Sequence, residues 1–201
     1  MARMLTSWIN AVVVHQMLSS NASRVLRRIE RTAERHFLPI IGQERGRILA
    51  ELARRFKPKR VLEVGTLVGY STILIGKELD GDAEIVTIEI DEAEAEWAKR
   101  NVRDAEINPK VRVLIGDALH VIPRLEGEFD MVFLDADKSD YLDHLGLIEA
   151  HVHKGSVVIA DNAGAYAYSM RDYLDYVRKS GKYDSSLVAA GGDGVEVSIK
   201  R

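Results

Sequence analysis

The sequence contains no cysteine among its 201 residues, so it forms no disulfide, no thiolate metal site and no cysteine nucleophile. A reducing compartment is compatible with this composition.

Long apolar runs are also missing. An apolar stretch near the start, Ile9–Val14, is followed by His15 and Gln16. It is too short to span a membrane and lacks the cleavage pattern of a signal peptide. We therefore expect a cytoplasmic protein with no membrane partner.

An excess of charge of one sign is missing as well. There are 28 Lys and Arg against 31 Asp and Glu, and the net charge of −3 leaves no electrostatic footprint for nucleic acid. The hydrophobic content of 46% excludes disorder along the whole chain. About 70% of the unfolded surface can be buried at this length. We expect one domain over residues 1–201, with a helical segment over 1–56 and a core over 60–201.

The first 56 residues have the apolar spacing of helices. We predict an amphipathic helix over 3–19, a second helix capped by Asn21 or Ser23, and a third over Glu44–Phe56. The second carries many arginines, which is typical of RNA binding or of a solvated face paired with acids at helical spacing. We favour the solvated face. The amphipathic helices in 1–36 exceed what a minimal domain needs, so we expect them to pack between subunits of a homodimer.

From Arg60 onward, short apolar runs alternate with helical segments. The predicted strands are 60–64, 85–89, 111–115, 130–134, 156–160, 185–190 and 195–200. The predicted helices are 71–78, 92–103, 118–125, 141–151 and 169–180. This alternation indicates an α/β fold with a doubly wound, mostly parallel, Rossmann-like sheet of seven strands, helices on both faces and an antiparallel pair at the C-terminus. The apolar strands indicate that both faces are covered.

In such sheets ligands bind just beyond the carboxyl ends of the strands. The first strand is followed by a loop containing Gly65 and Gly69, and Ser71 is a good N-cap for the next helix. The spacing is neither the dinucleotide fingerprint nor a phosphate-binding P-loop. Glu89 ends the second strand, 24 residues past Gly65, where an acid can accept hydrogen bonds from ribose hydroxyls. Asp117, after the third strand, either accepts from an adenine amine or caps the next helix.

Acids also end the fourth and fifth strands, which we expect to be neighbours. Asp135 follows the fourth strand, and Asp161 and Asn162 follow the fifth. Carboxylate and amide oxygens suit Mg²⁺ or Mn²⁺, and a divalent cation removes the cost of burying two carboxylates together. The alternative is that each acid caps a helix. We favour a metal site.

Together these segments resemble the cation-dependent O-methyltransferases, the family of catechol and caffeoyl-CoA O-methyltransferases. The resemblance covers residues 38–201. It rests on VLEVGTLVGYST at 61–72, TIEI at 87–90, FDMVFLDADKSDY at 129–141 and VVIADN at 157–162, with QERG at 43–46 and GDG at 192–194 as further landmarks. The stretch DADKxxY followed by a strand-ending Asp-Asn is the most specific part.

The resemblance implies a role for each matching residue. S-adenosylmethionine would be bound by Ile41, Glu63, Gly65, Thr66, Gly69, Ser71, Glu89, Asp117, Ala118 and Asp135. A divalent cation, Mg²⁺ in preference to Mn²⁺ or Ca²⁺, would be held by Asp135, Asp161 and Asn162. Lys138 and Asp135 would be catalytic, with Lys138 as the general base or as an electrostatic stabiliser. The chain departs from the family in lacking the inserted loop after Asn162. Between Ser180 and Gly191 it also has no acid placed to engage a second catechol hydroxyl.

The resemblance therefore implies methyl transfer from a sulfonium to a hydroxyl of a small acceptor with two neighbouring hydroxyls. Two other classes stay open. One is a methyltransferase acting on nitrogen or nucleic acid, although such enzymes often carry Asn-Pro-Pro-Tyr where this chain has Asp135-Ala136-Asp137-Lys138. The other is a non-catalytic nucleoside-binding regulator, which the presence of Lys138 beside the metal set disfavours.

Overall fold

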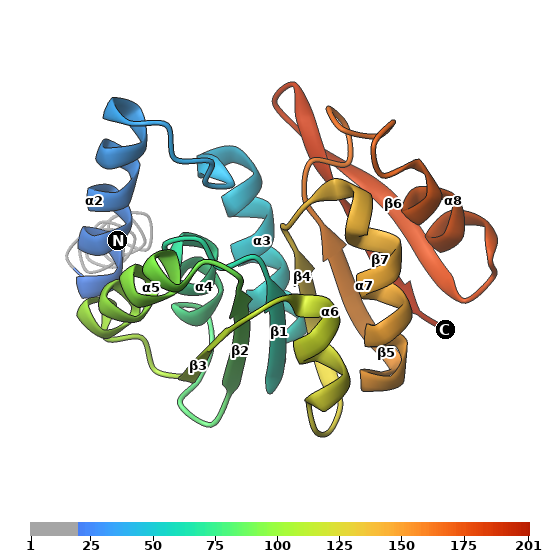
Figure 1. Ribbon diagram of the computed structural model, residues 1–201, viewed down its shortest axis with the longest axis horizontal. Helices are drawn as coiled ribbons and strands as arrows, with labels where there is room; N and C mark the ends of the chain where they lie inside the picture. The colour runs from blue at the N-terminus through green and yellow to red at the C-terminus, as the bar shows by residue number, and fades with distance from the viewer. Residues whose placement is uncertain (1–19) are drawn as a thin grey trace, which may run out of the picture.

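The computed structural model describes residues 20–201, which form one seven-stranded sheet with helices on both faces (Figure 1). The strand order is β3-β2-β1-β4-β5-β7-β6. The first five strands in this order are parallel, and β7 is antiparallel to both β5 and β6. The strands are β1 Arg60–Val64, β2 Glu84–Glu89, β3 Lys110–Ile115, β4 Phe129–Leu134, β5 Val152–Ala160, β6 Tyr183–Ala190 and β7 Asp193–Lys200. The predicted fold is confirmed.

The helices alternate with the strands as the sequence predicts. They are α2 Asn21–Arg35, α3 Gly42–Phe56, α4 Tyr70–Gly76, α5 Glu92–Ala105, α6 Ala118–Val121, α7 Tyr141–Ile148 and α8 Arg171–Lys179. Short 3₁₀ turns cover Ile122–Arg124, Lys138–Asp140 and Glu149–His151. The helix predicted over 3–19 lies outside the described residues.

Two hydrophobic layers hold the helices to the sheet. Successive strand residues point to opposite faces, so Val61 packs with α2 to α5 in one layer and Leu62 packs with α6 to α8 in the other. Both side chains are fully buried. The prediction that every strand is covered on both faces is wrong for β3, because this edge strand carries Lys110 and Arg112 and is partly exposed.

Several predicted element ends are wrong for local reasons. The cap of α2 is Ser20, whose hydroxyl accepts from the backbone N–H of Ser23 at 3.2 Å, and not Asn21 or Ser23. The first helix of the core begins after Gly69, in the left-handed conformation at φ 81°, so Ser71 lies inside the helix and does not cap it. The helix predicted over 118–125 changes to a 3₁₀ turn at Ile122–Arg124, which contains Pro123, a residue that cannot donate a helical hydrogen bond.

The apolar face of α2 is already used within the chain. Val25, Leu26 and Ile29 are buried against the core, and α2 packs on α4 and α5. It therefore offers no free apolar face to a second subunit, which removes that part of the argument for a homodimer.

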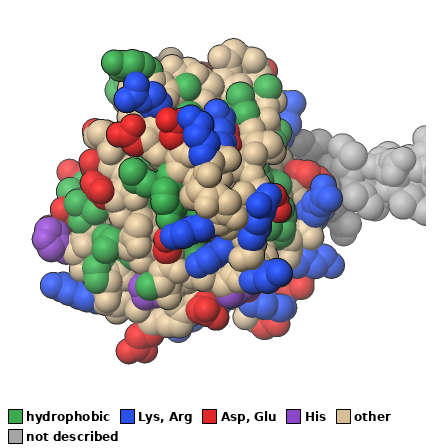
Figure 2. Space-filling view, turned by 90° about the vertical axis from the view of Figure 1, so that its right-hand side faces the viewer, with side chains coloured by type: hydrophobic (Ala, Val, Ile, Leu, Met, Phe, Trp, Pro, Cys, Tyr) green, Lys and Arg blue, Asp and Glu red, His purple; other side chains and the backbone are tan. Residues whose placement is uncertain are grey.

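Figure 2 shows the face formed by β6 and α8, where basic, acidic and hydrophobic side chains are intermixed. In residues 20–201, no helix combines the length and apolar character that crossing a membrane requires.

The strand ends bring the predicted site residues to one edge of the sheet. The backbone N–H of Asp135 donates to Val64 on β1 at 2.8 Å, and that of Asp161 donates to Leu134 on β4 at 3.0 Å. Gly65 has φ 94°, and a Cβ at this position would lie 2.2 Å from the Asp135 carbonyl oxygen. Only glycine lets the β1 loop turn this closely over the end of β4.

Candidate active site

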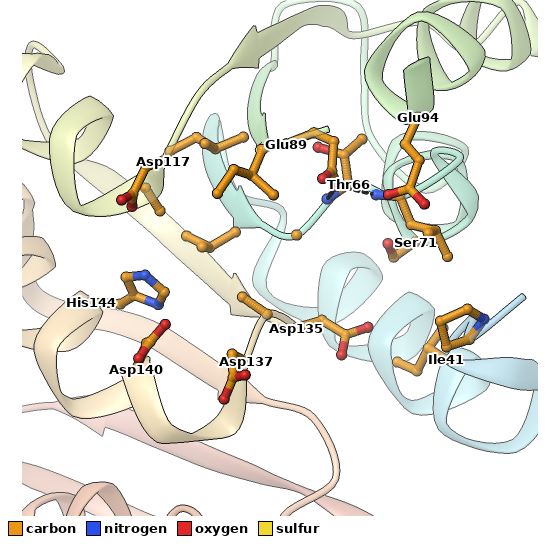
Figure 3. A pocket seen from close by; sticks show the side chains of 18 of the residues that line it. Ile41, Thr66, Ser71, Glu89, Glu94, Asp117, Asp135, Asp137, Asp140 and His144 are labelled. Carbon is orange, nitrogen blue, oxygen red and sulfur yellow. Dashed lines mark hydrogen bonds between the residues drawn. The ribbon is translucent and has the colours of Figure 1, made fainter. Parts of the chain in front are cut away.

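A pocket of about 310 Å³ lies over the carboxyl ends of β1, β2, β3 and β4 (Figure 3). Eight of the residues predicted to bind the cofactor line it: Ile41, Gly65, Thr66, Ser71, Glu89, Asp117, Ala118 and Asp135. The other two, Glu63 and Gly69, are not among its lining residues. The pocket therefore has the position that the sheet topology predicts for a ligand.

Glu89 lies in the middle of the pocket and holds the glycine loop. One carboxylate oxygen accepts from the backbone N–H groups of Thr66 at 3.1 Å and Leu67 at 2.7 Å, and the other accepts from Asp91 at 3.0 Å. Leu67 has φ 49°, an unfavourable conformation for a branched side chain that these hydrogen bonds help to maintain. Glu89 thus orders the loop and presents a 7% exposed carboxylate to the pocket.

Asp117 and His144 lie at one end of the pocket, and Ile41 and Ser71 lie at the other (Figure 3). Asp117 caps α6 by accepting from the backbone N–H of Leu119 at 2.8 Å. The capping role proposed as the alternative therefore exists, and the same side chain lines the pocket. Ile41 is 4% exposed and supplies an apolar wall ahead of α3. The pocket is elongated, with polar groups at both ends.

Glu63 lies in β1 below the pocket floor and is fully buried. The Thr72 hydroxyl donates to one of its oxygens, and the other oxygen has no hydrogen bond among the described residues. Burial raises the pKa of Glu63 to about 7, although the nearby hydroxyls of Ser71, Thr72 and Thr87 act to lower it. Its visible role is to support the strand under the glycine loop.

Lys138 lies between the end of β4 and α7. Its Nζ donates to Asp135 Oδ1 at 3.0 Å and to the hydroxyl of Tyr141 at 2.7 Å. The Tyr141 hydroxyl in turn donates to the carbonyl of Leu134 at 2.9 Å, and its ring is fully buried. Tyr141 therefore fixes the ammonium group beside the carboxylate of Asp135.

The carboxylates of Asp135 and Asp161 lie close enough to repel each other. Burial raises the pKa of Asp161 to about 7, with the charge of Asp135 as the second cause and Arg45 opposing it. Burial also raises the pKa of Asp135, against the neighbouring ammonium of Lys138. A positive charge between two such carboxylates would relieve this cost.

The fit of these residues to a cation depends on one atom, Asp161 Oδ1. This oxygen is buried and accepts no hydrogen bond among the described residues. Arg45 Nε lies 2.7 Å away, an ion pair by distance, but its N–H does not point at the oxygen. The buried carboxylate of Asp161, which has a vacant lone pair, and the partly buried carboxylate of Asp135 fit a hard divalent cation together with the amide of Asn162. In residues 20–201 no three His, Asp or Glu side chains gather as a metal site.

Sequence reasoning missed three residues at the site. His144 is 3% exposed, lines the pocket and has a lowered pKa because of its burial. It lies four residues after Asp140, another lining residue, and this helical spacing was an available signal. Arg45 was noted only as part of the QERG landmark, because its contacts to Asp161 and Asp193 join distant parts of the chain. Asp193 itself was noted only as a landmark.

Comparison with known proteins gives the family. The O-methyltransferase family model matches residues 16–171, more than half of the chain. The chain therefore belongs to the O-methyltransferase family. It is 35% identical to catechol O-methyltransferase B of Danio rerio over 172 residues, which are 79% of this chain and 64% of the relative. It is also 35% identical to catechol O-methyltransferase of Mycobacterium tuberculosis over 123 residues, 61% of this chain and 56% of that protein. The chain thus spans less than two thirds of the length of these relatives.

Solved structures agree over nearly the whole chain. Cofactor-bound Rv0187 from MTB superposes with a TM-score of 0.80 at 28% identity, covering 94% of this chain and 96% of that one. The O-methyltransferase TomG from Streptomyces achromogenes, solved in complex with SAM, gives a TM-score of 0.80 at 25% identity and covers 94% of each chain. These similarities support the same fold and family.

Proposed function

We propose that this protein is an S-adenosylmethionine-dependent, divalent-cation-dependent O-methyltransferase whose acceptor is a small aromatic molecule with two neighbouring hydroxyls. The family membership supports the reaction class. The cofactor, the cation and the acceptor are argued from the pocket and from the acids beside it. As in its relatives with solved structures, we expect one methyltransferase domain.

The shape and lining of the pocket support S-adenosylmethionine as its ligand. The cofactor supplies an electrophilic methyl group on a sulfonium. We assign the adenine end to Asp117, Ala118 and His144, and the ribose to Glu89. We assign the methionine end to Ile41, Ser71 and Asp135 at the other side. Glu63 and Gly69 would act from beneath, by supporting the strand and the loop.

The acids next to the methionine end support a cation site. Asp135, Asp161 and Asn162 would hold a divalent cation, preferably Mg²⁺, which supplies Lewis-acid polarisation of an acceptor hydroxyl. Because a phenol with a pKa of about 10 is mostly protonated at neutral pH, this polarisation is needed. The chain's own contribution is Lys138, whose Nζ is held 3.0 Å from Asp135 Oδ1. It can accept a proton there as the neutral amine, or stabilise a phenolate as the ammonium.

One observation carries the proposal. Asp135 lines the cofactor pocket and its charge also raises the pKa of Asp161. A single carboxylate thus joins the pocket to the buried acid pair. A methyl donor in the pocket would then lie beside an acceptor held by the cation, which supports an in-line transfer.

A methyl-transfer screen tests the proposal. The full chain is incubated with labelled S-adenosylmethionine and Mg²⁺, with catechol-type acceptors, their single-hydroxyl analogues, amines and RNA as separate arms. We expect label only in acceptors with two neighbouring hydroxyls. Label in amines or RNA would replace the acceptor class, and cofactor binding without transfer to any arm would indicate a regulator.

We further propose a homodimer, which sedimentation velocity tests directly.

A further inference from the structure

Asp193 gathers four hydrogen-bond donors at the edge of the buried acid pair. It is the first residue of β7, directly after the two-residue turn that joins β6 to β7. Its carboxylate accepts from Asn162 Nδ2 at 2.8 Å and Arg45 Nη1 at 3.0 Å. It also accepts from the backbone N–H groups of Gly164 at 3.0 Å and Ala165 at 2.7 Å. The side chain is only 10% exposed, so these contacts are sheltered from water.

The carboxylate determines which way the amide of Asn162 faces. An ionised carboxylate only accepts hydrogen bonds, so the NH₂ group of Asn162 must point to Asp193 and its oxygen away from it. The backbone of Asn162 is fixed as well, in the left-handed conformation at φ 62°. Gly164 leaves room for the carboxylate, because a Cβ there would lie 3.0 Å from Asp193 Oδ1.

The same carboxylate also holds Arg45, which comes from α3. While Nη1 of Arg45 bonds to Asp193, its Nε lies 2.7 Å from Asp161 Oδ1. Asp193 thus bonds directly to Asn162 and contacts Asp161 through Arg45, the two residues that follow β5. It lies outside the cofactor pocket and takes no part in its lining.

We propose that Asp193 is a positioning residue that makes the Asn162 amide present its oxygen, and not its NH₂ group, to the divalent cation. The inference rests on the proposed function, since that function supplies the cation. An amide nitrogen is a donor and cannot ligate a hard cation, so a reversed amide leaves the site with one ligand fewer.

Asp193→Asn tests this orientation with little change in shape. The new side chain can keep its oxygen toward the backbone N–H groups of Gly164 and Ala165. Its NH₂ group then faces the NH₂ group of Asn162, and the Asn162 amide turns over. We expect Mn²⁺ affinity, measured on the acceptor-free protein by the electron paramagnetic resonance signal of free Mn²⁺, to fall about 10- to 100-fold. Binding of S-adenosylhomocysteine, measured by calorimetry, should stay unchanged.

Two further variants separate orientation from charge and from folding. Asp184→Asn makes the same charge change on an exposed side chain of the same hairpin, which pairs with Arg201, and it should leave Mn²⁺ affinity at the wild-type value. The exchange Asn162→Asp with Asp193→Asn places the acceptor at 162 and the donor at 193. It should restore Mn²⁺ binding, because residue 162 again offers an oxygen while residue 193 donates to it.

The outcomes are distinct. Absence of Mn²⁺ binding by the wild-type protein would overturn the proposed cation dependence, and the inference with it. Wild-type binding together with equal affinity in Asp193→Asn would overturn the inference alone. One contrary result is that Asp193→Asn loses S-adenosylhomocysteine binding as well as Mn²⁺ binding, and another is that the exchange variant fails to recover Mn²⁺ affinity. Either result would show that Asp193 has a general structural role, and would contradict the proposal that it orients the Asn162 amide.

Discussion

Single residues at the strand ends combine structural and chemical roles. Glu89 orders the glycine loop through two backbone N–H groups and also faces the pocket. Asp117 caps α6 and lines the same pocket. For Asp117, sequence reasoning set capping and adenine binding against each other as alternatives, whereas a carboxylate has enough lone pairs for both. A capping contact is therefore weak evidence against a binding role.

Variants of Lys138 can show whether this residue acts as a general base or as an electrostatic stabiliser. If it accepts the acceptor's proton, Lys138→Ala should lower kcat roughly 10²- to 10⁴-fold at neutral pH, and higher pH should recover much of the loss. Lys138→Arg keeps the charge but cannot accept a proton, so it should be as slow as the alanine variant. The measurement is a pH–rate profile of all three proteins at saturating Mg²⁺. Wild-type rates in both variants would remove Lys138 from catalysis.

The buried carboxyl of Glu63 should make stability depend on pH. Its ordinary pKa is 4.5 and its value in the fold is about 7. Between these values the native state keeps a proton that the unfolded chain has released, so the free energy of unfolding falls as pH rises from 4.5 through 7. Each pKa unit is worth about 1.4 kcal/mol.

Glu63→Gln removes this titration, so its stability should fall less across that range. Thermal or urea unfolding at several pH values between 4.5 and 8 measures the difference. The difference between the variant and the wild type should level off below pH 4.5, where the carboxyl becomes protonated in both states. Parallel pH profiles for the two proteins would show that Glu63 is ionised in the fold.

At the site, the loop after β1 passes very close to the end of β4, and the closest backbone approach is between Gly65 and Asp135. Gly65→Ala would place a Cβ 2.2 Å from the Asp135 carbonyl oxygen at a φ of 94°. The backbone conformation alone costs about 1–3 kcal/mol in a residue other than glycine. We expect a lower melting temperature and lost S-adenosylhomocysteine binding, measured by thermal unfolding and calorimetry.

Gly146→Ala is the matched control. Gly146 is exposed in α7, and a Cβ there would meet nothing within 4 Å. Alanine should stabilise the helix by about 0.5–1 kcal/mol and leave cofactor binding unchanged. Equal behaviour of the two variants would contradict the role given to the β1 loop.

The elements were largely predictable from the sequence, and their ends were not. Buried strands such as β1 are short apolar runs, so their positions follow from composition alone. The start of α4 after Gly69 depends on a left-handed backbone conformation that residue spacing does not encode. The extension of β5 back to Val152 depends on its pairing with Phe129 of β4, which is a tertiary contact.

At the scale of the whole molecule, the sheet topology explains most of the candidate site. Placing Asp135 and Asp161 side by side required only that β4 and β5 be neighbours, which the alternation of elements already indicated. The contacts of Arg45 and Asp193 with the end of β5 could not be predicted, because α3, β5 and β7 are far apart in the sequence and meet only in the fold.

In the proposed reaction, methyl transfer depends on a cation held by Asp161. The most direct measurement compares the wild type with Asp161→Ala, using labelled S-adenosylmethionine and a catechol-type acceptor, in Mg²⁺ and in EDTA. We predict transfer by the wild type in Mg²⁺ only and no transfer by the variant, with S-adenosylhomocysteine affinity kept in both because Asp161 lies outside the cofactor pocket. Undiminished transfer in EDTA, or by Asp161→Ala, would contradict the account.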